Sequence, residues 1–270
     1  MDLSTITAAI TQLAYPLLIA ASIAMARAMG VIMLTPAFTR LGLTGIMRSA
    51  VAFAISIPVV PSIFVSLQSV DMPNALTLAG LIVKEMSIGA VIGMAFGIPF
   101  WAAEAAGELI DLQRGSTMSQ LVDPLSSGES SVTATLLSVC IIALFFMSGG
   151  FLFLLGAFYD SYDLWRPGSF TPIMNAGAPT VILSVLDSLL RVALVLTGPI
   201  IIAILITDVM MAFLSRMAPQ LHIFDLSLAI KNLLYALLIV FYIVFLMPLM
   251  LDQIDALQTR FDLLRDMVTQ

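Results

Sequence analysis

Residues 232–251 read NLLYALLIVFYIVFLMPLML, a run of twenty residues without an Asp, Glu, Lys or Arg. A helix that crosses the hydrocarbon core of a bilayer needs about 20 mostly apolar residues, and each central charge is energetically costly. Further charge-free runs occupy residues 3–26, 49–70, 86–103, 130–159 and 192–207. The six runs predict an all-α, polytopic membrane protein.

The composition agrees with this fold class. Hydrophobic residues make up 60% of the 270 residues and charged residues 10%, whereas roughly 25% of the residues in a soluble domain are charged. The chain has too few polar side chains to cover a soluble surface, so membrane lipid or other hydrophobic subunits must cover it. The net charge is −6 and Lys and Arg do not cluster, so we expect no nucleic acid partner.

The sequence offers no constellation for enzymatic chemistry. Cys140 is its only cysteine and His222 its only histidine, so the chain can form no intrachain disulfide and no Cys/His metal cluster. The His-Glu-x-x-His, Gly-x-Ser-x-Gly and phosphate-loop patterns are absent. We therefore expect no catalytic residues, no cofactor and no bound metal.

Three carboxylates open the longest polar segment, residues 104–131. Glu104, Glu108 and Asp111 are spaced by four and three residues, which places them on one face if a helix continues that far. Either an ion site or a solvated helix end fits this spacing. Because a metal would need further ligands, we favour the solvated helix end.

Two of the runs do not look like simple lipid-facing helices. The run at 86–103 follows directly after Lys84 and Glu85, and the run at 192–207 is short and ends at Asp208. Prolines also remove helical hydrogen bonds within or beside the runs, which predicts kinks. These prolines are Pro16, Pro58, Pro61, Pro99, Pro199 and Pro248.

Small residues predict one site of close helix packing. Gly89, Gly93 and Gly97 recur every four residues, so another backbone can approach that face closely. The partner is either another helix of the same chain or a second subunit, and the two alternatives are equally favoured. Asp187 and Arg191, at i and i+4, predict an ion pair on a helix.

Turn signals predict two helix boundaries. After the Asp123-Pro124 turn, Ser126 stands three residues before Glu129, the spacing of a capping box, so a helix should begin there and run through Phe146. A proline should end another helix near residue 218, with the next one beginning within 224–227. The prediction is one membrane-embedded domain, residues 1–270, with a central polar loop region at 104–131 and a polar C-terminal tail at 252–270.

Several short motifs together resemble one family. Residues 214–224 read LSRMAPQLHIF, residues 115–118 read GSTM, and residues 122–126 read VDPLS. They are similar to the T subunit of the type III secretion export apparatus, the SctT, YscT, HrcT and EscT family, which is homologous to flagellar FliR. Ser-Gly-Gly at 148–150 and Tyr-Asp-Ser-Tyr at 159–162 favour the injectisome branch over the flagellar one. A small-solute or ion transporter is the alternative from another class, because it would also tolerate broken helices.

The resemblance implies a place in a larger machine. It implies a multi-pass subunit of the bacterial inner membrane, with kinked, hairpin-like helices in a helical hetero-oligomeric pore. The implied partners are several copies each of the R and S subunits, then the U subunit and the V-type export gate protein. Unfolded secreted polypeptides would pass through the pore.

The resemblance also implies functional residues. A loop after the third apolar run would plug the channel, and other residues would pack helices or contact subunits. The plug residues would be Leu112, Gln113, Arg114, Gly115, Ser116, Thr117, Met118 and Ser119. The packing or contact residues would be Gly89, Gly93, Gly97, Asp123, Pro124, Arg216, Pro219 and Gln220.

Overall fold

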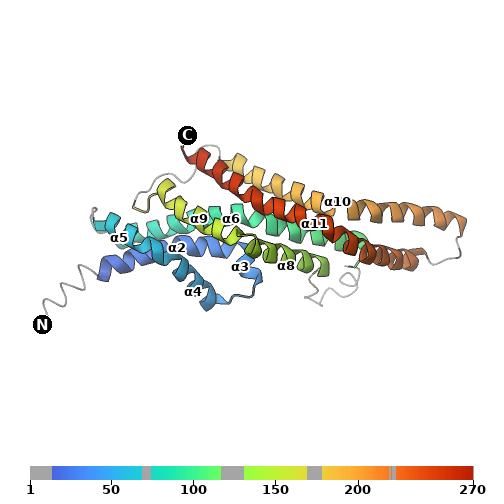
Figure 1. Cartoon of the computed structure of the whole chain (residues 1–270), viewed down its shortest axis with the longest axis horizontal. Helices are drawn as coiled ribbons and strands as arrows, with labels where there is room; N and C mark the ends of the chain where they lie inside the picture. The colour runs from blue at the N-terminus through green and yellow to red at the C-terminus, as the bar shows by residue number, and fades with distance from the viewer. Residues whose placement is uncertain are drawn as a thin grey trace, which may run out of the picture. The chain divides into compact units, whose positions relative to one another are not determined.

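The computed structural model describes residues 14–68, 74–116, 131–168, 178–218, 220 and 223–269, and within these ranges the chain is helical, without strands. The prediction of an all-α chain is confirmed. The elements, in chain order (Figure 1), are α2 (Tyr15–Leu34), α3 (Pro36–Arg40), α4 (Gly45–Ser56), η2 (Ile57–Val59), α5 (Val60–Gln68), α6 (Ala75–Arg114), α8 (Val132–Met147), α9 (Gly150–Leu164), α10 (Ala178–Met217) and α11 (Ile223–Thr269).

Five described helical segments are long and apolar enough to cross a membrane. They are Tyr15–Leu34, Gly45–Leu67, Ala75–Arg114, Val185–Met217 and Phe224–Gln258. A sixth span arises if α8 and α9, bent by 69° at their junction, count as one. A polytopic membrane protein is thereby confirmed.

The run at 130–159 is two helices rather than one. Gly149 has a φ of 86°, a left-handed conformation that glycine adopts without steric cost, and it separates α8 from α9. Ser131 caps the start of α8, since its hydroxyl accepts a 3.0 Å hydrogen bond from Ala134 N. The predicted capping box at Ser126 and Glu129 lies outside the described residues. The predicted break near residue 218 is confirmed, because α10 ends at Met217 and α11 begins at Ile223.

The chain divides into two compact units. Unit 1 comprises Met1–Gly97, Gly149–Ile182 and Leu257–Gln270, and unit 2 comprises Ile98–Ser148 and Leu183–Ala256. Three long helices, α6, α10 and α11, contribute residues to both, and Pro99, Pro199 and Pro248 lie inside them. Residues 252–270, expected to be a polar tail, continue α11 as far as Thr269.

In unit 1, helices α2 and α6 touch through their backbones. A methyl group added at Gly89 would lie 2.0 Å from Arg27 O, and one at Gly30 would lie 2.3 Å from Met86 O. A methyl group at Gly93 would lie 2.7 Å from Val31 O. Only glycine permits such an approach. At Gly89 and Gly93 the close partner is thus a helix of the same chain; Gly97 is buried as well.

This close approach encloses charged side chains. Arg27 on α2 and Glu85 on α6 are fully buried, with Arg27 Nη2 2.6 Å from Glu85 Oε2. Arg27 also donates to Ser161 Oγ at 2.9 Å and to Trp165 O at 2.8 Å, and its guanidinium lies 3.7 Å from the centre of the Tyr162 ring. The arginine therefore joins α2 and α6 to the end of α9.

Lys84 completes this network. Its Nζ forms a 2.8 Å ion pair with Glu85 Oε1, and it donates to Arg166 O at 2.9 Å. The apolar run at 86–103 begins after these two charged residues, but α6 begins earlier, at Ala75, so both charges lie inside the helix. Arg27 pairs with Glu85, and a backbone carbonyl distant in sequence accepts a hydrogen bond from Lys84.

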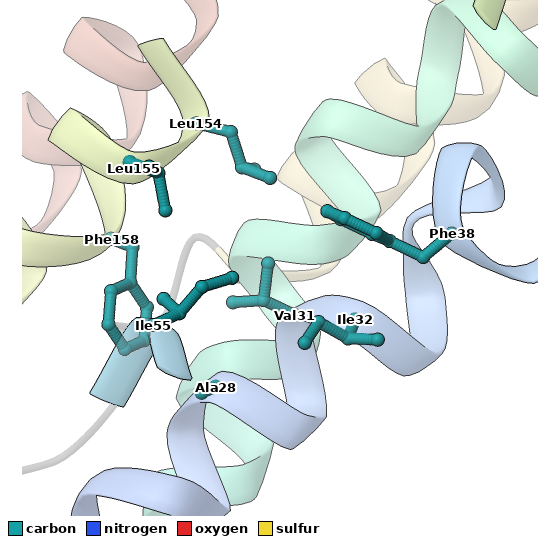
Figure 2. A pocket seen from close by; sticks show the side chains of 8 residues that line it. All are labelled: Ala28, Val31, Ile32, Phe38, Ile55, Leu154, Leu155 and Phe158. Atoms are coloured by element: carbon teal, nitrogen blue, oxygen red, sulfur yellow. The ribbon is translucent and has the colours of Figure 1, made fainter. Parts of the chain in front are cut away.

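A small cavity in unit 1 has no room for a ligand. Figure 2 shows a cavity of unit 1 surrounded by α2, α3, α4 and α9, into which side chains such as Phe38 and Leu154 point. Its volume is about 10 Å³, at the lower limit for one water molecule. Its lining is entirely apolar, so it should stay dry.

Candidate functional site

The predicted plug begins inside a helix. Leu112, Gln113 and Arg114 form the last turn of α6, and Gly115 ends it with a φ of 79°. Gly115 N donates to Leu112 O at 3.2 Å and Ser116 N to Asp111 O at 3.1 Å, the two bonds of a Schellman motif. Thr117, Met118 and Ser119 lie outside the described residues.

Asp111 joins the end of α6 to the start of α8 in unit 2. Ser131 Oγ donates to Asp111 Oδ2 at 2.6 Å, and Thr133 N donates to the same oxygen at 3.1 Å. Thr133 Oγ1 and Arg114 Nε both donate to Oδ1, the latter at 2.8 Å. We call these four residues, Asp111, Arg114, Ser131 and Thr133, the clasp. One carboxylate thus accepts hydrogen bonds from both sides of the connection between α6 and α8.

Glycine makes the clasp geometrically possible. A methyl group at Gly107 would lie 2.2 Å from both Ala134 Cα and Ala134 N. The backbones of α6 and α8 are therefore in contact one turn before Asp111. This contact brings the short hydroxyl side chains of α8 within reach of the carboxylate.

Helix α11 holds the clasp from another side. Arg114 Nη1 donates to Asn232 Oδ1 at 3.0 Å, and the guanidinium lies 4.6 Å from the centre of the Tyr235 ring. Tyr235 Oη is 2.8 Å from Thr133 Oγ1. Lys231 lies nearby, donating to Gln113 O at 3.4 Å and forming a 2.8 Å ion pair with Asp208 of α10. The end of α6 is therefore tied to α8 and α11 by polar contacts.

The interpretation of the three carboxylates as a solvated helix end is wrong for Asp111. Glu108 is exposed and Glu104 half-buried, but Asp111 is only 1% exposed. Three of the four hydrogen bonds to Asp111 come from Ser131 and Thr133, about twenty residues further along the chain, and helix spacing does not reveal them. The described residues contain no group of three or more His, Cys, Asp or Glu side chains that could hold a metal.

One signal could have indicated the clasp. An Asp in the last turn of a helix faces the negative end of the helix dipole, which is unfavourable unless donors come from elsewhere. Asp111 stands four residues before Gly115, the glycine at the left-handed position of the Schellman motif. No comparable signal marks Gly107 or Tyr235.

The remaining predicted residues that the structure describes do not join this site. Arg216 lies in the last turn of α10 and Gln220 in the turn that follows, and both are exposed. Asp123, Pro124 and Pro219 are not among the described residues. Asp187 and Arg191 are exposed on α10, and no salt bridge joins them among the described contacts, so the predicted ion pair is not formed.

Comparison with known proteins now identifies the chain. The sequence model of the family described as "Bacterial export proteins, family 1" matches residues 6–257. Yop proteins translocation protein T of Yersinia pestis is 35% identical over 217 residues, 80% of this chain and 82% of that protein. Secretion system apparatus protein SsaT of Salmonella typhimurium is 29% identical over 221 residues, 82% and 85% of the two chains. Flagellar biosynthetic protein FliR of Pectobacterium carotovorum is 30% identical over 191 residues, 70% and 71%.

A multi-pass helical membrane protein with these relatives is a component of a protein-export apparatus. The chain belongs to family 1 of the bacterial export proteins, and within it to the T subunits of type III secretion, which are related to flagellar FliR. The predicted family and the location in the bacterial inner membrane, within the base of the secretion system, are thereby confirmed. Members of this family are structural subunits of the export apparatus, so the chain associates with other export components.

Proposed function

We propose that this chain forms part of a channel for unfolded polypeptides, and that the segment beginning at the end of α6 closes it. The channel would be completed by several copies of R- and S-type subunits, with U-type and V-type export proteins beyond them. The role is gating rather than catalysis. The relatives named for the Yop, SsaT and flagellar systems support an export role, and the Yop and SsaT names favour an injectisome.

The main observation in favour of a channel completed by other subunits is the length of the exposed apolar surface. Exposed apolar side chains of α10 run from Leu183 to Met217, about 51 Å at about 1.5 Å per residue. A straight helix would need a tilt of about 54° to fit them within about 30 Å of hydrocarbon, beyond the roughly 0–40° found for membrane helices. Part of this surface therefore requires protein neighbours.

Helix α11 supports the same proposal. In the most apolar stretch of Phe224–Gln258, only 11% of the residues are buried. Large side chains such as Leu233, Phe241 and Phe245 are mostly exposed. Lipid can cover one face of such a helix. Its continuation to Thr269 makes it 47 residues long, about 70 Å at about 1.5 Å per residue. R- and S-type hydrophobic helices are the proposed cover for the remainder.

The contacts at the end of α6 reduce the number of residues that we assign to the plug. Leu112 to Ser116 are held by the Schellman motif and the clasp, which suits an anchor better than a moving part. We therefore place the occluding residues downstream of Ser116, with Met118 at the constriction, since its unbranched side chain adapts to irregular gaps.

Replacing Thr117, Met118 and Ser119 with three glycines tests this role. The variant should assemble normally but raise the ion leak through the export apparatus severalfold, because the glycines remove every side chain that fills the constriction. Leak is measured in cells that carry the whole secretion system and is divided by the amount of assembled complex. Leu41→Gly, in the exposed turn after α3, is the control and should not leak. A triple-glycine variant as tight as wild type would refute the plug.

A further inference from the structure

We propose that one face of the helical segment Gly45–Leu67, formed by α4, η2 and α5, lies against membrane lipid in the assembled export apparatus. This face would remain in contact with hydrocarbon when other subunits cover much of α10 and α11. The inference goes beyond the proposed channel and does not depend on it. It concerns contacts within unit 1 only.

The segment has a buried face and an exposed face. Its buried residues recur at helical spacing, and α4 and α5 pack against α2. These buried residues are Ala52, Ser56, Val59, Ile63 and Leu67. The large apolar side chains of the opposite side are 51–86% exposed, and we call them the outer face: Ile46, Met47, Phe53, Ile57 and Val65. A continuous exposed apolar face of this kind requires an apolar cover.

The length of the outer face matches a bilayer. From Ile46 to Val65 it measures about 29 Å at about 1.5 Å per residue, and the hydrocarbon core of a bilayer is about 30 Å thick. Residues 49–70 contain no Asp, Glu, Lys or Arg. Lipid can therefore cover the whole outer face without a tilt, whereas the exposed surface of α10 is too long for such a cover.

The serine hydroxyls of this segment bond to its own backbone. Ser62 Oγ donates to Val59 O at 2.8 Å, and Ser66 Oγ donates to Ile63 O at 2.7 Å. Both serines are exposed. Hydrocarbon offers no hydrogen-bond acceptor, so a donor that faces it must find its partner within the protein. These serines meet that condition without help from another subunit.

The backbone meets the same condition at Pro61. Proline has no N–H, so residue 61 cannot donate to Ile57 O as a regular helix would require. The 3₁₀ turn η2 compensates, because Val60 N donates to Ile57 O instead. Ile57 and Pro61 are both exposed, so an unsatisfied carbonyl between them would meet hydrocarbon. A local 3₁₀ adjustment of this kind makes a proline tolerable in a membrane helix.

Positive charge lies at one end of the outer face. Arg40 is exposed shortly before the segment, and Arg48 is half-buried in its first turn, where its Nε donates to Leu43 O at 2.8 Å. Basic side chains near the end of a membrane helix reach the headgroup layer, where anionic lipids attract them. The charge at this end is therefore complementary to a lipid surface.

Photo-cross-linking in cells that carry the whole secretion system tests the inference. A diazirine amino acid of aliphatic size replaces Phe53 or Ile57 on the outer face, or Ile63 on the buried face as the control. After irradiation, the apparatus is purified and its adducts are identified by mass spectrometry. Positions 53 and 57 should yield phospholipid adducts, and position 63 should not. Adducts from 53 and 57 mainly to another subunit, or to a second copy of this chain, would overturn the inference.

Two substitutions of one residue keep the test decisive if no adduct forms. Ala54 is exposed near the middle of the segment. Lipid yields to a larger apolar side chain, so Ala54→Phe should assemble within about twofold of wild type, whereas Ala52→Phe, on the buried face, should not. Ala54→Asp would place a charge in hydrocarbon, so the amount of chain in the membrane should fall by about tenfold. Normal membrane levels of Ala54→Phe without assembly would indicate a subunit interface, and wild-type levels of Ala54→Asp would indicate water. Either result would overturn the inference.

Discussion

Replacing Glu85 with alanine should lower the free energy of unfolding by about 3–5 kcal/mol, because it leaves buried cations without their acid. Arg27 and Glu85 are both fully buried, and Lys84 is only 7% exposed. Without Glu85, two positive charges would lie in an apolar interior without the carboxylate that is 2.6 Å from Arg27 and 2.8 Å from Lys84. We expect the variant to be depleted from membranes and to unfold at a much lower temperature in detergent.

Two further variants test the physical reason. Glu108→Ala removes an exposed carboxylate from the same helix and should have little effect. Changing Arg27, Lys84 and Glu85 together to methionine removes every charge of the network, so it should be less damaging than Glu85→Ala alone. The account of this network is wrong if Glu85→Ala and Glu108→Ala accumulate and unfold alike.

Gly89→Ala is the second change expected to have a large effect. The new methyl group would lie 2.0 Å from Arg27 O and 3.1 Å from Gly30 Cα, both backbone atoms that no rotamer change can move. Helices α2 and α6 would have to separate, which costs at least the roughly 1–3 kcal/mol typical of overpacking. The separation would also pull Arg27 away from Glu85. Thermal unfolding of the purified full-length chain should show a clear loss of stability.

Gly156→Ala is the matched control. Gly156 is also in a helix of unit 1, α9, but a methyl group there would meet nothing within 4 Å. Alanine is favoured over glycine in a helix by about 1 kcal/mol, so this variant should be as stable as wild type or more stable. Equal behaviour of Gly89→Ala and Gly156→Ala would contradict the close contact of α2 with α6.

Local features of the sequence were sufficient to predict most helices. The run at 232–251 lies within α11, and the proline near residue 219 follows the end of α10. The helix expected to run through Phe146 ends at Met147, but the bend that follows, at Gly149 with its positive φ, is not revealed by apolarity alone. Hydropathy therefore predicts which residues enter a helix better than it predicts where a helix bends.

The polar contacts could not be predicted in the same way. Arg27 binds groups 58 to 138 residues away, and Asp111 binds groups 20 and 22 residues away across the connection between two helices. Such pairs depend on which helices become neighbours. The spacing of charges along one helix does not reveal this. The family resemblance identified the chain correctly, but the plug and subunit-contact residues stay predictions.

A photo-reactive amino acid at Met118 tests the central claim, that this chain closes an export channel next to the clasp. The apparatus is assembled in cells with a secreted protein stalled during export, and the cross-linked products are identified by mass spectrometry. The account predicts an adduct between position 118 and the stalled polypeptide, whereas the same probe at exposed Leu233 on α11 should capture lipid or other subunits. An adduct to the polypeptide from position 233 but none from position 118 would contradict it.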